Sequence, residues 1–413
     1  MKSTIPLLGG CTLIAAACLL IAACKKSSTE QQLQPVPGSA GKGAVMAATA
    51  AAQSHSYLTL FDGGPSGQHS FRIPSIVKTK NGTLVAICEC RRWNNTDWGD
   101  INVVYKRSFD NGATWTAMGE IAASGDDTWG NPTSVYDPSS GTNGRIWVFM
   151  SWNDGALTSI SQVDTWGERK VYSSYSDDQG ATWSTPADRT AALLPPGYTW
   201  DAMGPGIGIV TQFNHPGRLI IPAKGRNIYS DDHGATWNYS PTPAGSDEGT
   251  IVERMDGTLL RNDRPVTSQW ELSKRRRVSV GSIESGFPAF TSDNTLLDPK
   301  CEASILRYNT DAPNRIVFLN SASTVTRGKM RVRISYDNGQ TWPISRRIYD
   351  WLTEDEAQQQ GKGGYTSMIK TADYHVAALI ETNEDTNNNS TSHRSIEFHK
   401  FNLPWILNGN PEP

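Results

Sequence analysis

Short runs of alternating apolar and polar residues recur along most of this chain. Ile101–Tyr105 and Arg331–Ile334 are two clear examples. A period of two residues places successive side chains on opposite faces of a strand, so each run predicts a half-buried β-strand. The composition also leans away from helix, because the 413 residues include 37 glycines and 23 prolines. The pattern therefore predicts an all-β fold built from many short strands.

An octapeptide of the form S-x-D-x-G-x-T-W recurs between these runs. Full copies occupy residues 108–115, 176–183, 230–237 and 335–342, and a degenerate copy lies at 282–286. Successive copies start roughly 52 to 68 residues apart, a spacing that matches one four-stranded antiparallel blade per repeat. We therefore predict a six-bladed β-propeller of four-stranded antiparallel blades over residues 57–408.

The repeat has a structural interpretation. Its Asp can accept backbone N–H groups across a tight turn, and its Gly supplies a positive φ angle. Its Thr and Trp are expected to begin the next strand, with the Trp covering the blade. Four equivalent aspartates in four blades cannot share one active site. We therefore interpret them as turn braces: Asp110, Asp178, Asp232 and Asp337.

The first 24 residues have the features of an export signal. Lys2 precedes an apolar stretch, Ile5–Ala23, that is too short and too interrupted for a confident transmembrane span. The stretch ends in Leu-Ile-Ala-Ala-Cys24, which is similar to the lipobox of bacterial lipoproteins. That resemblance implies export and a lipid anchor at Cys24 in a bacterial envelope membrane. An ordinary secretory signal with an incidental cysteine is the alternative. Residues 25–56 are predicted to be a flexible tether.

The remaining composition argues against several kinds of chemistry. A net charge of −3 offers no electrostatic footprint for nucleic acid, and the basic run Lys274–Arg277 is interpreted as a solvated strand face. The seven histidines form no metal motif. Cys88, Cys90 and Cys301 lack metal-ligand spacing, so we expect them to be small buried residues. We expect neither a metal nor a cofactor.

The tetrapeptide Phe71-Arg72-Ile73-Pro74 precedes the first copy of the octapeptide. An F-R-I-P element followed by regularly spaced copies of this repeat, known as Asp boxes, resembles the catalytic domain of bacterial sialidases (neuraminidases). The resemblance covers nearly all of the chain after the tether. It implies an exo-α-sialidase, a retaining glycosidase that removes terminal sialic acid from glycans, glycoproteins or glycolipids. We expect it to act as a monomer.

Sialidases of this family hold the carboxylate of the sugar with three arginines. Planar guanidinium groups suit this task, because the carboxylate stays ionised and needs a fixed orientation. By resemblance, the first arginine is Arg72 of the F-R-I-P element and the second is Arg264. The third is Arg327, ahead of the last full Asp box, with Arg331 and Arg333 as competing candidates.

The same resemblance indicates a tyrosine nucleophile. A carboxylate nucleophile would approach the anionic anomeric centre against like-charge repulsion, whereas a tyrosine is neutral until it reacts. Tyr365, in Gly-Tyr-Thr-Ser-Met, matches the late motif of the family and is the expected nucleophile. Glu248 matches the glutamate that takes its proton. Glu253, five residues later, is the weaker candidate because it falls on the other face of a strand.

The loop after Cys90 resembles the segment that supplies the general acid. Asp97 is the expected acid, because substrate can bury a loop aspartate and raise its pKa. Asp100 is the competing candidate, although its place next to the Ile101 strand suits a turn brace. Arg91 matches an additional family arginine that contacts a sugar hydroxyl.

Two other functions remain open at this point. One is a sialoglycan-binding propeller without catalysis, which would require Tyr365 or Glu248 to be misplaced. The other is a trans-sialidase or a hydrolase of a related 2-keto sugar acid, which the sequence does not separate from a sialidase.

Overall fold

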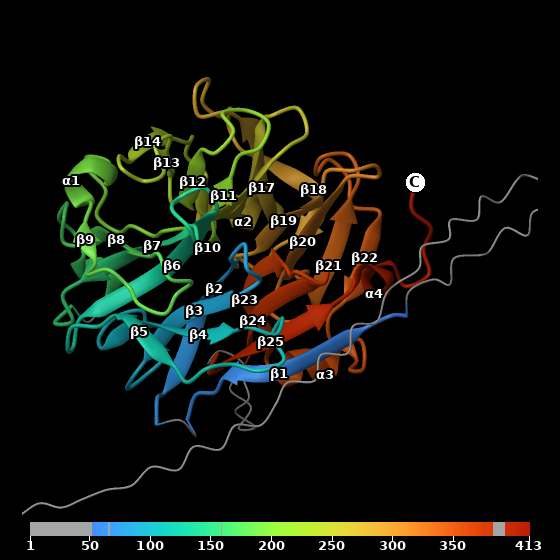
Figure 1. The fold of residues 1–413 in the computed structure, drawn as a ribbon, viewed down its shortest axis with the longest axis horizontal. Helices are drawn as coiled ribbons and strands as arrows, with labels where there is room; N and C mark the ends of the chain where they lie inside the picture. The colour runs from blue at the N-terminus through green and yellow to red at the C-terminus, as the bar shows by residue number, and fades with distance from the viewer. Residues whose placement is uncertain (1–51, 65–66, 158, 383–392) are drawn as a thin grey trace, which may run out of the picture. The chain divides into compact units, whose positions relative to one another are not determined.

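The computed structural model of the protein describes residues 52–413, except 65–66, 158 and 383–392. The predicted signal peptide and most of the predicted tether lie outside these residues. Within the described chain the strands form six four-stranded antiparallel units, and the first strands of neighbouring units contact one another (Figure 1). The predicted six-bladed propeller is therefore confirmed.

The blades follow one another along the chain. Blade 1 contains β2 (Ser70–Lys78), β3 (Leu84–Arg91), β4 (Ile101–Ser108) and β5 (Gly119–Ala122). Blade 2 contains β6 (Thr128–Asp137), β7 (Arg145–Asn153), β8 (Lys170–Ser176) and β9 (Ala187–Asp188). Blade 3 contains β11 (Ile209–Val210), β12 (Leu219–Ala223), β13 (Arg226–Ser230) and β14 (Asn238–Pro241). The short strand β10 (Gly206–Ile207) precedes blade 3 and pairs with β6.

The other three blades complete the ring. Blade 4 contains β15 (Ser246–Glu253), β16 (Leu259–Pro265), β17 (Arg275–Gly281) and β18 (Thr291–Leu297). Blade 5 contains β19 (Ser304–Asn309), β20 (Arg315–Ser321), β21 (Met330–Ser335) and β22 (Ile344–Arg347). Blade 6 contains β23 (Lys362–Lys370), β24 (Val376–Thr382), β25 (Ser395–Phe401) and the N-terminal β1 (His55–Phe61). The helices are short: η1 (Ile160–Gln162), α1 (Thr190–Leu193), α2 (Thr267–Ser273), α3 (Glu354–Gln359) and α4 (Leu403–Leu407). No helix in the described residues is long and apolar enough to cross a membrane.

The first strand of each blade is innermost and runs from one face of the ring to the other. Early residues of these strands, such as Arg72 and Tyr365, line a cavity of about 280 Å³ at the first face. Later residues, such as Val77 and Ile369, line a more apolar cavity of about 290 Å³ at the opposite face. Because successive strands are antiparallel, the turns between third and fourth strands lie at that opposite face. The Asp boxes occupy these turns, away from the first cavity.

Each full Asp box braces its turn in the same way. In the first box, Asp110 Oδ1 accepts the Ser108 hydroxyl at 2.8 Å and the Thr114 backbone N–H at 2.9 Å. Asn111 and Gly112 follow with φ angles of 56° and 91°. Equivalent bonds form in the other full boxes, around Asp178, Asp232 and Asp337. The predicted turn-brace role of the four aspartates is confirmed.

The box tryptophans were predicted to begin the next strand, but each of them precedes it. Trp115 precedes the start of β5 by four residues, and its ring packs edge-on against Phe398 of blade 6 at 5.1 Å. Gly112 lies against the same ring, since a Cβ atom at this position would come within 2.3 Å of Phe398. The box therefore fastens its own blade to the preceding one, which explains why both Gly and Trp recur in it.

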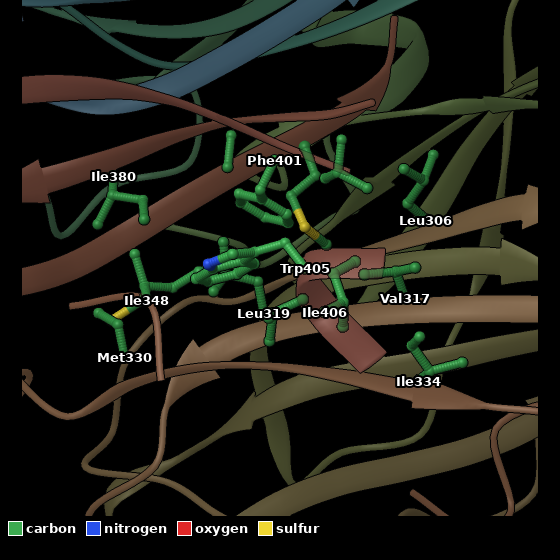
Figure 2. Packing of buried hydrophobic residues seen from close by; sticks show 14 of the residues in the cluster. Leu306, Val317, Leu319, Met330, Ile334, Ile348, Ile380, Phe401, Trp405 and Ile406 are labelled. Atoms are coloured by element: carbon green, nitrogen blue, oxygen red, sulfur yellow. The ribbon is translucent and has the colours of Figure 1, made fainter. Parts of the chain in front are cut away.

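Hydrophobic residues fill the spaces between neighbouring blades. Figure 2 shows the cluster between blades 5 and 6, which includes Val317 and Leu319 of β20, Ile380 of β24 and Phe401 of β25. The side chain of Trp405 of α4 packs among these residues. Burial of this apolar surface holds the blades together.

Two sequence interpretations concern buried positions. Cys88, Cys90 and Cys301 are all buried and unbridged, as predicted. The basic run is not simply a solvated face, because Arg276 is fully buried at the start of β17. Its guanidinium donates to Asp298 Oδ2 at 2.7 Å and to carbonyl and amide oxygens around it. These hydrogen bonds offset the free-energy cost of burying the charged guanidinium group, a cost that an arginine on a solvated strand face does not have.

The N-terminal strand closes the ring. β1 pairs in antiparallel register with β25, from His55 opposite Phe401 to Phe61 opposite Ile396. In the same blade the buried carboxylate of Glu397 accepts bonds from Tyr349, Lys362 and His399 at 2.6–2.9 Å. Burial alone would raise the pKa of Glu397, but the bonds from His399 and Lys362 lower it to about 2.

Glu397→Gln is therefore expected to flatten the acid limb of the stability curve. The ordinary pKa of a glutamate is 4.5 and that of Glu397 is about 2, so its ionised form stabilises the fold fully above pH 4.5. This stabilisation is lost as the pH falls toward 2. The wild-type free energy of unfolding should fall by about 3 kcal/mol more than that of the variant across this window. Denaturant unfolding at a series of pH values measures both curves, and parallel curves would contradict the role of Glu397.

Candidate active site

The cavity at the first face brings together all seven residues that the sequence singled out for binding or catalysis. They are Arg72, Arg91, Asp97, Glu248, Arg264, Arg327 and Tyr365. Blades 1, 4, 5 and 6 and their loops supply these side chains, from positions up to 293 residues apart in the sequence. Each lies near the start of a first strand, near the end of a second strand, or in a loop at the same face. Propeller geometry therefore gathers them around the axis.

Tyr365 lies at the centre of this group. The residue is 4% exposed, and its hydroxyl donates a short hydrogen bond to Glu248 Oε2. Arg264 Nη1 donates to both the phenol oxygen and the same Glu248 oxygen. Burial raises the pKa of Tyr365, which Arg264 partly offsets, and burial also raises the pKa of Glu248. The arrangement pairs a neutral phenol with a base that can take its proton.

Three guanidinium groups surround the phenol. Those of Arg72 and Arg327 lie 5.4 and 5.2 Å from the centre of the Tyr365 ring, and Arg264 contacts its oxygen. Arg72 and Arg264 are each paired with a glutamate. Arg327 has no carboxylate partner among the described residues and donates to the backbone oxygen of Lys300 at 3.3 Å. The cavity therefore has positive charge available for an anionic ligand.

The competing arginines lie elsewhere. Arg331 pairs with Glu354 at 2.6 Å on the outer part of blade 5. Arg333 is buried and donates to the side chain of Asn320 at 2.8 Å. Neither lines the cavity, whereas Arg327 does.

Glu381, which the sequence did not single out, braces both Arg72 and Tyr365. Its carboxylate accepts two bonds from the Arg72 guanidinium at 3.2 Å and the backbone N–H of Tyr365 at 3.0 Å. The Ile73 N–H adds a bond at 2.8 Å. Although burial opposes ionisation, Arg72 and these donors hold the pKa of Glu381 at about 2. Its permanent negative charge fixes Arg72 over the phenol.

Asp97 lies across the cavity entrance on the β3–β4 loop. Its side chain is 48% exposed, and its Oδ1 lies 2.9 Å from Arg91 Nη2 and 3.7 Å from Arg72 Nη1. Burial of the loop works against ionisation, but Arg91 and Arg72 lower the pKa of Asp97 below its usual value. Arg91 is itself held by Glu89 through two bonds of 2.6 and 2.9 Å. The free protein therefore carries an ionised Asp97.

The two other acidic candidates, Asp100 and Glu253, stabilise loops outside the cavity. Asp100 pairs with Arg92 at 3.6 Å, and its backbone oxygen accepts the Arg92 N–H, so it braces the loop outside the cavity. Glu253 accepts three consecutive backbone N–H groups, from residues 212 to 214, at the opposite face. Neither Asp100 nor Glu253 lines the cavity around Tyr365.

Arg169, Trp200, Lys224 and Asp247 also line the cavity and were not singled out in the sequence. The buried Arg169 guanidinium stacks on Trp200 at 4.0 Å and donates to Asn131 Oδ1 at 2.7 Å. No local motif marks Arg169, Trp200 or Lys224, and only the placement of blades 2 and 3 in the ring brings these three residues to the site. Within the described residues no cluster of His, Cys, Asp or Glu is arranged to hold a metal ion.

Comparison with known proteins gives a consistent picture. A family model described as a BNR repeat-like domain matches residues 120–376. An exo-alpha-sialidase of Aspergillus fumigatus is 44% identical over 83% of this chain and 86% of its own length. An exo-alpha-sialidase of Arthroderma benhamiae is 42% identical over the same shares. The solved structure of the Hadza microbial sialidase Hz136 superimposes with a TM-score of 0.69 at 24% identity, covering 84% of this chain and 68% of that one. With its propeller, its Asp boxes and this degree of identity, the chain belongs to the sialidase family.

Proposed function

We propose that this protein is an exo-α-sialidase that hydrolyses terminal, α-ketosidically linked sialic acids from glycoconjugates with retention, through a tyrosyl-enzyme intermediate. The observation that carries the proposal is the hydrogen bond from the buried Tyr365 hydroxyl to Glu248, beneath three arginines. The identity to two exo-alpha-sialidases over most of the chain supports it.

The arginines account for recognition of the sugar acid. A sialic acid carries its carboxylate on the anomeric carbon, so an ionised ligand group must sit beside the reacting atom. Arg327, without a carboxylate partner among the described residues, supplies uncompensated charge to that group. Arg72 and Arg264 bind the same carboxylate. Their ion pairs with Glu381 and Glu248 hold the planes of the two guanidinium groups in place. Fixed guanidinium forks bind and orient a carboxylate at once.

The first chemical step then uses the tyrosine and its partner. Glu248 takes the phenolic proton while the Tyr365 oxygen attacks the anomeric carbon and the glycosidic bond breaks. Asp97 gives its proton to the departing oxygen. A neutral nucleophile avoids the repulsion that a carboxylate would meet at this carbon. The product is a sugar bound covalently to Tyr365, with Glu248 protonated and Asp97 ionised.

The second step reverses these roles. Asp97 takes a proton from water, whose oxygen attacks the anomeric carbon from the face that the aglycone left. The bond to the Tyr365 oxygen breaks, and Glu248 returns its proton to the phenolate. Two displacements at one carbon give net retention. Both carboxyl groups finish in their starting states.

Substrate binding prepares Asp97 for the first step. In the free protein Arg91 and Arg72 lower its pKa. A substrate carboxylate on Arg72 offsets part of this positive charge, and the sugar removes water from the half-exposed side chain. Both changes raise the pKa of Asp97 toward that of a working general acid.

The direct test is release of free sialic acid from a mixed-linkage sialylated glycoprotein and from sialyl-lactose. Hydrolysis should release the free sugar without an added acceptor. Transfer to an added lactose in place of release would indicate a trans-sialidase. Binding of the glycoprotein without release would indicate a non-catalytic propeller.

We further propose that the protein is exported and lipid-anchored through Cys24. The support is the sequence Ala22-Ala23-Cys24 at the end of an apolar segment, followed by about 30 residues of tether composition. Cys24→Ser should move the protein from the membrane fraction to soluble or signal-retained fractions. Immunoblots of fractionated cells measure this shift. Unchanged fractionation of the variant would leave a plain secreted enzyme.

A further inference from the structure

The strand that carries Tyr365 is irregular where it enters the cavity. Lys362 of β23 pairs with Thr382 of β24, but the next regular pair is Thr366 with Ile380. Three residues of β23, 363–365, therefore lie opposite the single residue Glu381 of β24, which is a bulge. A bulge aims a side chain at a site, but it also removes backbone groups from the ladder. The backbone around the phenol needs partners from other segments.

Two buried glutamates supply these partners on either side of Tyr365. Glu381 of β24 accepts the N–H of Tyr365 at 3.0 Å. Glu302, which precedes β19 of blade 5, accepts the N–H of Thr366 at 2.8 Å. Glu381 also holds Arg72, whereas the Glu302 carboxyl group accepts a single hydrogen bond within the described residues, the one from Thr366.

Glu302 is held rigidly in place. It is 1% exposed, and its neighbour Cys301 packs against Tyr365 and Ile73. The Cys301 backbone is bonded on both sides, by the Arg276 guanidinium at 2.6 Å and by Asp298 at 3.1 Å. The second carboxyl oxygen of Glu302 has no partner in the described part of the chain and faces Gly206, where a Cβ atom would lie 3.4 Å from it.

We propose that Glu302 is a positioning residue for the nucleophile: its carboxyl oxygen fixes the Tyr365–Thr366 peptide and thereby aims the phenol at the anomeric carbon. This inference rests on the proposed role of Tyr365. Glu302 touches neither the substrate cavity nor the phenol, and it acts through the backbone. Displacing a reacting atom by about 1 Å can lower a rate about 10²-fold, so one buried bond at this peptide is enough to matter.

The hydrogen-bond acceptor, and not the charge, is the feature required. Burial raises the pKa of Glu302 well above its usual range. Glu302→Gln keeps an acceptor oxygen at the same reach, Glu302→Asp keeps the carboxyl group but shortens it by one methylene, and Glu302→Leu removes the acceptor. The expected order of activity is therefore wild type and Gln, then Asp, then Leu.

The experiment measures the rate of covalent capture, in which 2,3-difluorosialic acid forms a bond with Tyr365. The mass of the intact protein reports how much has reacted at each time. Equilibrium affinity for an unreactive unsaturated sialic acid analogue is measured in parallel. Glu302→Leu should slow capture about 10²-fold and Glu302→Asp should slow it less, and both should leave affinity within about threefold. Glu302→Gln should capture within about threefold of wild type. Should the Leu variant fail to fold, the comparison of Gln with Asp still decides.

Glu253 provides the matched control. It is also a buried glutamate that accepts backbone N–H groups, but it lies at the opposite face. Glu253→Gln and Glu253→Leu should affect thermal stability and not capture. Unimpaired capture in Glu302→Leu and Glu302→Asp, or equal losses of capture and affinity, would overturn the positioning role alone. A wild-type protein labelled at a residue other than Tyr365 would overturn the nucleophile assignment and this proposal together.

Discussion

Tyr365→Phe is expected to lower turnover of sialyl-lactose by at least about 10³-fold while affinity for sialic acid stays within about threefold. The phenol oxygen is the only atom removed. In the proposed mechanism it forms the covalent bond of the first step, but the arginines proposed to hold the carboxylate remain, with Arg72 still braced by Glu381. Steady-state kinetics and equilibrium binding separate the two effects. Near-normal turnover of the variant would rule out the mechanism as assigned.

Arg327→Ala is the control for that experiment, because it should show the opposite balance. Arg327 lies 5.2 Å from the centre of the Tyr365 ring, and we propose that it contacts the substrate carboxylate before and during the reaction. Loss of a charged hydrogen bond should weaken binding about 10- to 100-fold. Interactions present in both the ground and transition states affect KM more than kcat. A variant with unchanged KM would remove Arg327 from the carboxylate site.

Asp97→Asn is expected to lose about 10²- to 10⁴-fold in activity on sialyl-lactose and far less on an aryl sialoside. The alkoxide of galactose leaves poorly without a proton, whereas an activated phenolate leaves readily. Asparagine keeps the size of the side chain beside Arg91 but cannot donate the proton. Initial rates on the two substrates, each compared with wild type, give the leaving-group dependence.

Asp100→Asn is the control, because Asp100 braces the same loop outside the cavity. It should depress both substrates about equally, through poorer positioning of the loop. A leaving-group-dependent loss in Asp100→Asn, with equal losses in Asp97→Asn, would transfer the acid role to Asp100.

The seven candidate residues that line the cavity could be proposed from the sequence because each lies in or near a recognisable motif. Phe71-Arg72-Ile73-Pro74 and the Asp boxes fix the frame, and the box spacing gives the number of blades. Asp97 and Asp100 could be ranked but not separated by sequence, since both follow an arginine pair on one short loop. Their distances to Arg91 and Arg92 distinguish them.

The supporting residues could not be found in this way. Glu381 acts on Arg72, which is 309 positions earlier in the chain, and Glu302 acts on a peptide 64 positions later. No local pattern distinguishes such a glutamate from the others on strands. Arg276 was misjudged for the same reason, because its partners Asn262 and Asp298 lie on other segments. Contacts between blades depend on which residues of neighbouring blades lie side by side in the ring, and the periodicity of the sequence does not specify this.

The pairing of β1 with β25 has a consequence for how the chain reaches its folded state. β1 is the first strand of the described chain and β25 is the last, so Ser56 meets Lys400 only after the blades between them have been synthesised. Closing so long a loop makes folding slow, and until then β25 and its neighbours present an open, adhesive edge. Deletion of a few residues of β25 would leave β1 without its pairing partner and β24 with one unpaired edge. β1 and β25 therefore depend on each other to form, although neither strand lines the cavity around Tyr365.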